Sequence, residues 1–167
     1  MGWRSLDRLA GFLARVGAVL AAVLVVAITG IVGFAVVMRY VLNQPQSWTD
    51  ELVSYLLVMI IMLGAAEVLR RGEHIAVDIL TERLSPRARR WVEVWGMAAV
   101  LFVAVVVGIS GWKVAAFSRM MGIVSEGYME VPIWLPQTLV PIGMAMLGLA
   151  ALARLLQLLV EGGGPRP

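Results

Sequence analysis

The sequence predicts an all-α integral membrane protein with four membrane-spanning helices. Hydrophobic residues make up 60% of its 167 residues and charged residues 15%, and the mean hydropathy is +0.88. Soluble domains are about 45–50% apolar and about 25% charged. The apolar residues also lie in long runs that approach or exceed the roughly 20 residues needed to cross a hydrocarbon core of about 30 Å. The predicted spans are residues 16–38, 51–69, 91–112 and 132–156 of a single membrane domain, 1–167.

The first span follows a short amphipathic segment. Residues 1–15 combine apolar residues such as Leu9 and Phe12 with Arg8 and Arg15, a pattern typical of a helix that lies on the membrane surface. The span itself exceeds the roughly 7–15 apolar residues of a signal peptide, and no small-x-small cleavage site follows it. We therefore expect it to remain as a membrane anchor.

The second span should begin at a helix cap. Ser47-Trp48-Thr49-Asp50 has the spacing of a capping box, and Asp50 and Glu51 would lie at the positive end of the helix dipole. Residues 72–85, which include His74 and Asp78, place most apolar side chains on one helical face and polar ones on the other. This pattern predicts a second interfacial segment, between the second and third spans.

The last two spans carry proline signals. Ser85-Pro86 is typical of an N-cap followed by proline at the first helical position, so the third helix should begin before residue 91. Pro141 removes a backbone hydrogen bond inside the fourth helix, which predicts a kink that another helix covers. Residues 161–167 are expected to form a flexible tail.

The arginine and lysine residues predict the orientation of the bundle. Cytoplasmic loops of membrane proteins carry an excess of these residues. Two loops here are poor in them, with only Arg39, Lys113 and Arg119, while the N-terminal segment and the central loop are rich. The rich set is Arg4, Arg8, Arg15, Arg70, Arg71, Arg83, Arg87, Arg89 and Arg90. Both termini and the central loop are therefore expected on the cytoplasmic side of a bacterial inner membrane.

The composition excludes several kinds of chemistry. The chain has no cysteine and one histidine, His74, which excludes disulfides, thiol catalysis and a haem held by two histidines of one chain. No Walker loop, metal-ligand cluster or nucleophile–base set is present, so we expect no enzyme and no cofactor. The basic residues flank apolar spans, which favours membrane lipids over nucleic acid as their partners.

Glu67 is the candidate for a functional charge within the membrane. A self-sufficient small cation-coupled transporter, working as an oligomer, could use this carboxylate. Arg70 and Arg71 lie three and four residues further on, where they could form ordinary ion pairs with it at the interface. His74 could likewise be a pH switch or a structural residue, and a membrane anchor of a redox complex is a third possible function.

Small residues predict close contacts between helices. They recur in the first span at Ala27, Gly30 and Gly33 and in the third span at Ala104, Gly108 and Gly111.

Several short motifs occur in a fixed order at the ends of the spans. They are Arg39-Tyr40-Val41-Leu42, Ser47-Trp48-Thr49-Asp50-Glu51-Leu52, Leu63-Gly64, His74-Ile75-Ala76-Val77-Asp78, Pro132-Ile133-Trp134-Leu135-Pro136 and Pro141-Ile142-Gly143. With these motifs the sequence resembles the small permease subunit of tripartite ATP-independent periplasmic (TRAP) transporters, over most of the chain.

The resemblance implies a non-catalytic subunit that pairs with a large permease subunit. In this family the large subunit carries the sodium and substrate sites and moves as an elevator, while a periplasmic binding protein delivers the substrate, typically an organic acid. The small subunit would be a scaffold. The matching residues are expected at subunit interfaces or in structural roles: Arg39, Tyr40, Trp48, Asp50, Glu51, Glu67, His74, Asp78, Pro132, Trp134, Pro141 and Gly143. Among them, Arg39 is expected to pair with Glu51.

Overall fold

The computed structural model describes residues 2–71 and 86–161, and this part of the chain is helical apart from its loops. The elements are α1 (Gly2–Tyr40), α2 (Trp48–Arg71), α4 (Pro86–Met121), α5 (Trp134–Gln137) and α6 (Leu139–Glu161). Within the described residues, α1, α2, α4 and the α5–α6 unit give four helices that are long and apolar enough to cross a membrane. The predicted all-α fold with four spans is confirmed.

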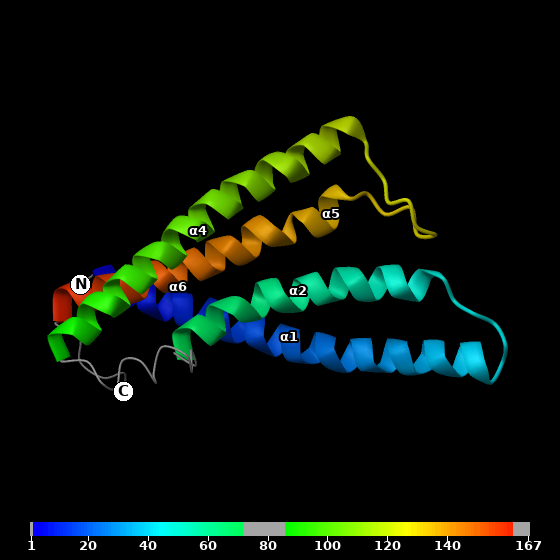
Figure 1. Ribbon diagram of the computed structural model, residues 1–167, viewed down its shortest axis with the longest axis horizontal. Helices are drawn as coiled ribbons and strands as arrows, with labels where there is room; N and C mark the ends of the chain where they lie inside the picture. Colours follow the sequence, from blue (N-terminus) through cyan, green and yellow to red (C-terminus); the bar gives the residue numbers. More distant parts are fainter. Residues whose placement is uncertain (1, 72–85, 162–167) are drawn as a thin grey trace.

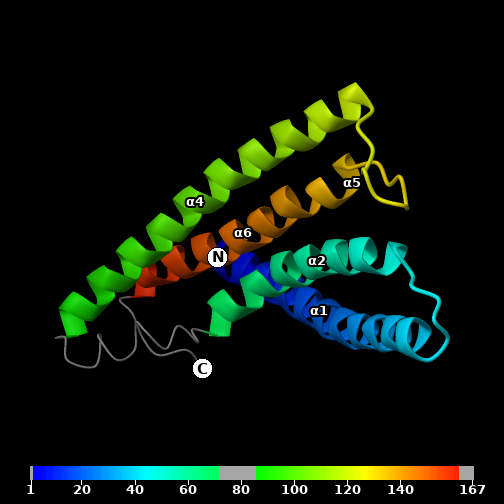
Figure 2. The ribbon, with the colours of Figure 1, turned by 45° about the vertical axis from the view of Figure 1, so that its right-hand side comes forward.

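The helices form two antiparallel pairs that share one end (Figure 1). α1 packs on α2 and α4 packs on α6, while contacts of α6 with α2 and α1 join the pairs. The helices converge at the end that holds the start of α1 and the end of α6, which we call the terminal end (Figure 2). They diverge towards residues 41–47 and 122–133, which we call the loop end.

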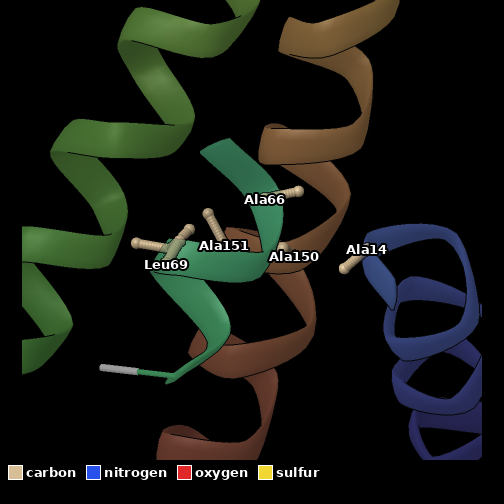
Figure 3. Packing of buried hydrophobic residues seen from close by; sticks show 5 residues of the cluster. All are labelled: Ala14, Ala66, Leu69, Ala150 and Ala151. Carbon is tan, nitrogen blue, oxygen red and sulfur yellow. The ribbon is translucent and has the colours of Figure 1, made fainter. Parts of the chain in front are cut away.

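The core lies near the terminal end and consists mainly of alanines. Ala14 of α1, Ala66 and Leu69 of α2, and Ala150 and Ala151 of α6 form one buried cluster (Figure 3). Small side chains let the helix backbones approach closely, as is usual between helices in lipid. Many long apolar side chains are exposed instead, among them Phe12, Val26 and Phe102.

α1 is one continuous helix of 39 residues, with no boundary between the predicted interfacial helix 1–15 and the first span. Its sequence contains no proline, and Gly11 and Gly17 are buried against neighbouring helices rather than at a break. At 1.5 Å per residue α1 is about 58 Å long, which exceeds the hydrocarbon core of about 30 Å. It ends before Asn43, which has a left-handed conformation (φ 56°), and Pro45.

α4 starts at Pro86, as the sequence predicted, and continues nine residues past the predicted span end at 112. Gly122, with φ 65°, ends it. The N–H of Gly122 donates to the carbonyl of Arg119, and the N–H of Ile123 donates to the carbonyl of Ser118. This is a Schellman motif, in which glycine adopts the left-handed conformation without steric cost.

The fourth span is divided between Gln137 and Leu139. Pro141 has no N–H to donate to the carbonyl of Gln137, which is the last residue of α5. The hydroxyl of Thr138 donates to the carbonyl of Leu135 at 2.6 Å, and this contact tightens the junction. The interruption that the sequence predicted from Pro141 therefore falls one turn earlier in the chain.

Two predicted segments lie outside the described residues. These are the interfacial segment 72–85, with His74 and Asp78, and the tail beyond Glu161.

Candidate functional site

Glu51 joins the first turn of α2 to the 122–133 loop. Its Oε1 accepts hydrogen bonds from the hydroxyls of Ser125 and Tyr55, the second at 2.9 Å. Its Oε2 accepts a hydrogen bond from the backbone N–H of Met129 at 3.1 Å. A Cβ at Gly127 would overlap this carboxylate, so a larger residue there would displace the Glu51 side chain. One carboxylate thus holds the loop against α2.

The predicted pair of Arg39 with Glu51 is wrong, because Glu51 faces the other loop. Successive residues of an α-helix point about 100° apart. Asp50 therefore faces α1, where it lines a hollow of about 170 Å³ together with Arg39 and Tyr40. Arg39 has no ion pair within the described residues. The sequence predicted correctly that a carboxylate in the first turn of α2 fixes a loop, but it predicted the wrong partner. Nothing in the sequence around Ser125 and Met129 indicates that they contact Glu51.

The start of α2 is not held by the predicted capping box but by other side chains. The indole N–H of Trp48 donates to the side-chain oxygen of Gln46 at 3.0 Å, and the hydroxyl of Thr49 donates to the backbone carbonyl of Gln46 at 2.8 Å. Thr49 is buried. In this described part of the chain, neither Ser47 nor Asp50 makes the side-chain contacts of a capping box.

Pro132 and Trp134 lie where the loop returns to the bundle. Pro132 forms an isolated antiparallel bridge with Val124. The guanidinium carbon of Arg119, near the end of α4, lies 5.1 Å from the centre of the Trp134 ring. This cation–π contact connects α4 to α5.

Pro141 and Gly143 lie in the contacts of α6. A Cβ built on Gly111 of α4 would lie 3.3 Å from the Cδ of Pro141, so α4 covers this stretch as the sequence predicted. A Cβ built on Gly143 would lie 2.6 Å from the Cβ of Met62 and 2.8 Å from its carbonyl oxygen. Gly143 is therefore the residue that lets α6 approach the backbone of α2.

Glu67 is occupied by an ion pair. Its Oε1 lies 3.0 Å from the Nε of Arg71, and the Glu67 side chain is 14% exposed. Arg70 pairs instead with Asp7 of α1, at 2.8 Å. The sequence predicted that Arg70 or Arg71 could pair with Glu67. Arg71 does so within α2, whereas Arg70 pairs with a residue of α1.

A second interhelical ion pair was missed by the sequence reasoning. The Nε of Arg154 on α6 lies 2.7 Å from the Oε1 of Glu93 on α4, and Arg154 also donates to the side chain of Gln157 at 2.9 Å. Nearby, Arg90 donates to the carbonyl of Leu158 at 2.7 Å. The sequence does hold a hint of this pair, because Glu93 and Arg154 carry opposite charges and lie near the terminal ends of two predicted spans.

The predicted stripes of small residues differ in their contacts. Ala104 is buried against α6, and Gly108 and Gly111 also contact that helix. By contrast, a Cβ at Gly30 or Gly33 of α1 would have no described atom within 4 Å.

These contacts indicate a structural role for the side chains rather than a catalytic or metal-binding one. Among the described residues, no group of three or more His, Cys, Asp or Glu side chains could hold a metal ion. Three carboxylates at these contacts have partners: Asp7 and Glu93 pair with arginines of other helices, and Glu51 binds the loop.

Comparison with known proteins adds independent information. The family model described as "Tripartite ATP-independent periplasmic transporters, DctQ component" matches residues 28–161. The chain is 30% identical over 97 residues, 56% of its length, to the sialic acid TRAP transporter permease protein SiaT of Haemophilus influenzae. It is 28% identical over 101 residues, 60% of its length, to the C4-dicarboxylate TRAP transporter small permease protein DctQ of Rhodobacter capsulatus. It is 25% identical over 133 residues, 67% of its length, to the protein of the same name from Vibrio cholerae.

The matched segments cover only part of these relatives. They span 16% of the Haemophilus protein, 44% of the Rhodobacter protein and 57% of the Vibrio protein. All of these relatives are named as permease proteins of transporters.

Proposed function

The chain belongs to the DctQ component family of tripartite ATP-independent periplasmic transporters, and from this premise we propose that it is the small, non-catalytic membrane subunit of a secondary transporter. The transporter is sodium-coupled and takes up an organic acid that a periplasmic binding protein delivers. The chain scaffolds a large elevator-type permease subunit in the inner membrane, with both termini in the cytoplasm. Relatives named for sialic acid and C4-dicarboxylates, both organic acids, support the substrate class.

The pairing of the charged side chains on the spanning helices is the observation that supports a scaffold. A chain that coupled cation movement to transport by itself would need a carboxylate free to bind and release the cation. Glu67, the candidate for that role, is held by Arg71 at 3.0 Å. Glu93 is held by Arg154 and Asp7 by Arg70, so these groups connect helices.

The exposed surface of α1 supports a large partner. A Cβ at Gly30 or Gly33 would meet no described atom of another helix within 4 Å, although small residues are typical of helix contacts in membranes. A helix of the large permease subunit packed on this face would bury the stripe.

The contacts at the loop end are consistent with an outer surface on which the binding protein docks. Arg39, Tyr40, Trp48 and Asp50 lie there beside the loop that Glu51 holds. A surface held in this way could receive the binding protein without reordering its own loop. We further propose that His74 and Asp78 orient the cytoplasmic interfacial segment.

Copurification and uptake measurements test this function. The chain is expressed together with a candidate large permease subunit from the same genome and purified through a tag on one subunit. The complex is then reconstituted into proteoliposomes with the binding protein. We expect a stable complex of the two subunits, and sodium-dependent uptake only when both are present. Uptake by this chain alone would contradict the proposal.

The variant Glu67→Gln separates the scaffold from the alternative of a self-sufficient transporter. We expect Glu67→Gln to retain sodium-dependent uptake in the two-subunit complex, as Glu126→Gln, a matched change in the exposed loop, should also do. Loss of uptake in Glu67→Gln alone, with the complex still intact, would favour the alternative.

A further inference from the structure

An apolar groove lies between α4 and α6 and opens to the surroundings. It has a volume of about 550 Å³ and is lined by Leu101, Val105 and Trp112 of α4 and by Ala145 and Leu152 of α6, among others. Its floor includes small residues, which leave room between the two helices. The groove therefore offers an open apolar slot between the two helices.

A second hollow continues the groove at the loop end. It has a volume of about 420 Å³, shares Trp112 with the groove and adds Ala115, Arg119 and Trp134. The lining residues of α4 recur every three or four positions from Leu101 to Arg119, which places them along one face of the helix. The two hollows thus follow one another along one face of α4, which we call the path, and its lining is apolar at Leu101 and basic at Arg119.

The length of the groove, the apolar part of the path, matches one leaflet of a bilayer. Leu101 and Trp112 are about 16 Å apart along α4 at 1.5 Å per residue. Half of a hydrocarbon core of about 30 Å is about 15 Å. Tryptophan is enriched at the boundary between hydrocarbon and headgroups, so Trp112 is suited to mark it. Arg119, about 10 Å further along α4, then lies at headgroup level.

Two cations of α4, Lys113 and Arg119, lie at this end of the path. Lys113 lines the groove near Trp112, and Arg119 lines the second hollow. Neither has a carboxylate partner within the described residues, whereas Arg70, Arg71 and Arg154 each do. The Trp134 ring holds the Arg119 guanidinium at 5.1 Å. A phosphodiester would supply the missing negative charge, because guanidinium groups bind phosphate oxygens in pairs.

We propose that this path binds one anionic phospholipid, with an acyl chain in the α4–α6 groove and the phosphate at Arg119. The charge favours this occupant over a transmembrane helix of another protein. An apolar helix in the groove would fill the slot but would leave Arg119 and Lys113 without a counter-ion.

Native mass spectrometry of the full-length chain in mild detergent tests the proposal. Phosphatidylglycerol and phosphatidylcholine with the same acyl chains are titrated separately. We expect one phosphatidylglycerol to bind, with phosphatidylcholine binding about tenfold or more weakly. Arg119→Gln should reduce the affinity for phosphatidylglycerol about tenfold, since a charge-assisted contact is lost. The matched control Arg39→Gln, at the same end of the molecule but outside the path, should leave it unchanged.

A groove-filling variant tests the acyl-chain position. Ala145 lines the groove and is exposed, so the larger side chain of Ala145→Leu should enter the slot and weaken the binding of both lipids. As an independent readout, phosphatidylglycerol brominated on its acyl chains should quench the fluorescence of the wild-type protein more than that of Trp112→Phe.

Three results would overturn the proposal. The first is equal affinity of Arg119→Gln and Arg39→Gln for phosphatidylglycerol. The second is equal binding of the two lipids by the wild-type chain. The third is a complex with the large permease in which a partner helix cross-links to position 145 and phosphatidylglycerol no longer binds.

Discussion

The guanidinium of Arg154 on α6 donates to the carboxylate of Glu93 on α4, with 2.7 Å between Nε and Oε1. The Arg154 side chain is 12% exposed and the Glu93 side chain 32%. Both residues belong to helices long and apolar enough to cross a membrane, where an unpaired charge is costly. The pair connects α4 and α6, the same two helices that line the proposed lipid groove.

Removing one partner of this pair should destabilise the protein. Exposed ion pairs contribute about 0–1 kcal/mol, and breaking a fully buried pair costs about 3–5 kcal/mol. For this partly buried pair we expect Arg154→Met to lower stability by about 1–3 kcal/mol, measured as a lower Tm in detergent. Arg15→Met, which removes an exposed arginine, is the control. The double variant Glu93→Leu with Arg154→Met should recover most of the loss, because no charge is left alone. A Tm as low in the double variant as in Arg154→Met would contradict this account.

Loss of the Glu51 carboxylate should release the 122–133 loop. A hydrogen bond to a charged group contributes about 1.5–3 kcal/mol, so in Glu51→Ala the Met129 amide should exchange with deuterium about 10- to 100-fold faster. Hydrogen–deuterium exchange with mass spectrometry measures this rate. Asp50→Ala removes the adjacent carboxylate, which faces α1, and should leave the exchange of Met129 unchanged. Faster exchange in both variants to the same degree would mean that Glu51 does not hold the loop.

Adding one methyl group at Gly143 and at Gly33 should have opposite effects. In Gly143→Ala the new Cβ meets the backbone of Met62, and overpacking of this kind costs about 1–3 kcal/mol. In Gly33→Ala the Cβ meets no described atom, and alanine favours the helix by up to about 1 kcal/mol. Thermal unfolding of the purified chain should show a lower Tm for the first variant and an equal or higher Tm for the second. A change of the same sign in both would refute the close approach of α6 to α2.

The orientation predicted from the arginines can be tested because the chain has no cysteine. A single cysteine in Glu126→Cys lies in the loop at the loop end, and one in Arg89→Cys lies near the start of α4. A membrane-impermeant maleimide added to spheroplasts should label the first variant. The second should react only after the membrane is permeabilised, because the arginine-rich end faces the cytoplasm. The reverse labelling pattern would invert the proposed topology.

The composition and the apolar runs were sufficient to predict the all-α membrane fold, because lipid as a solvent requires long helices whatever their mutual arrangement. Local chemistry also predicted some ends and breaks correctly. α4 starts at Pro86, and the fourth span is interrupted, although one turn before Pro141. Gly122 explains where α4 ends, but its left-handed conformation is seen only in the structure.

The pairing of the charges was decided by the tertiary structure. The sequence predicted that Glu51 pairs with Arg39, whereas in the structure Glu51 accepts hydrogen bonds from Ser125 and Met129. It placed no ion pair between the third and fourth spans, where Glu93 and Arg154 meet.

The physical reason for this division lies in what each level of structure specifies. By itself the sequence determined which segments are helical and apolar, since each depends on neighbours within a few turns and on the solvent. It did not determine how far each helix is rotated about its axis or where the helices diverge. Those depend on close contacts such as that of Gly143 with Met62, which bring together residues far apart in the chain. Rotation by one residue, about 100°, is enough to turn Asp50 towards α1 and Glu51 towards the opposite loop.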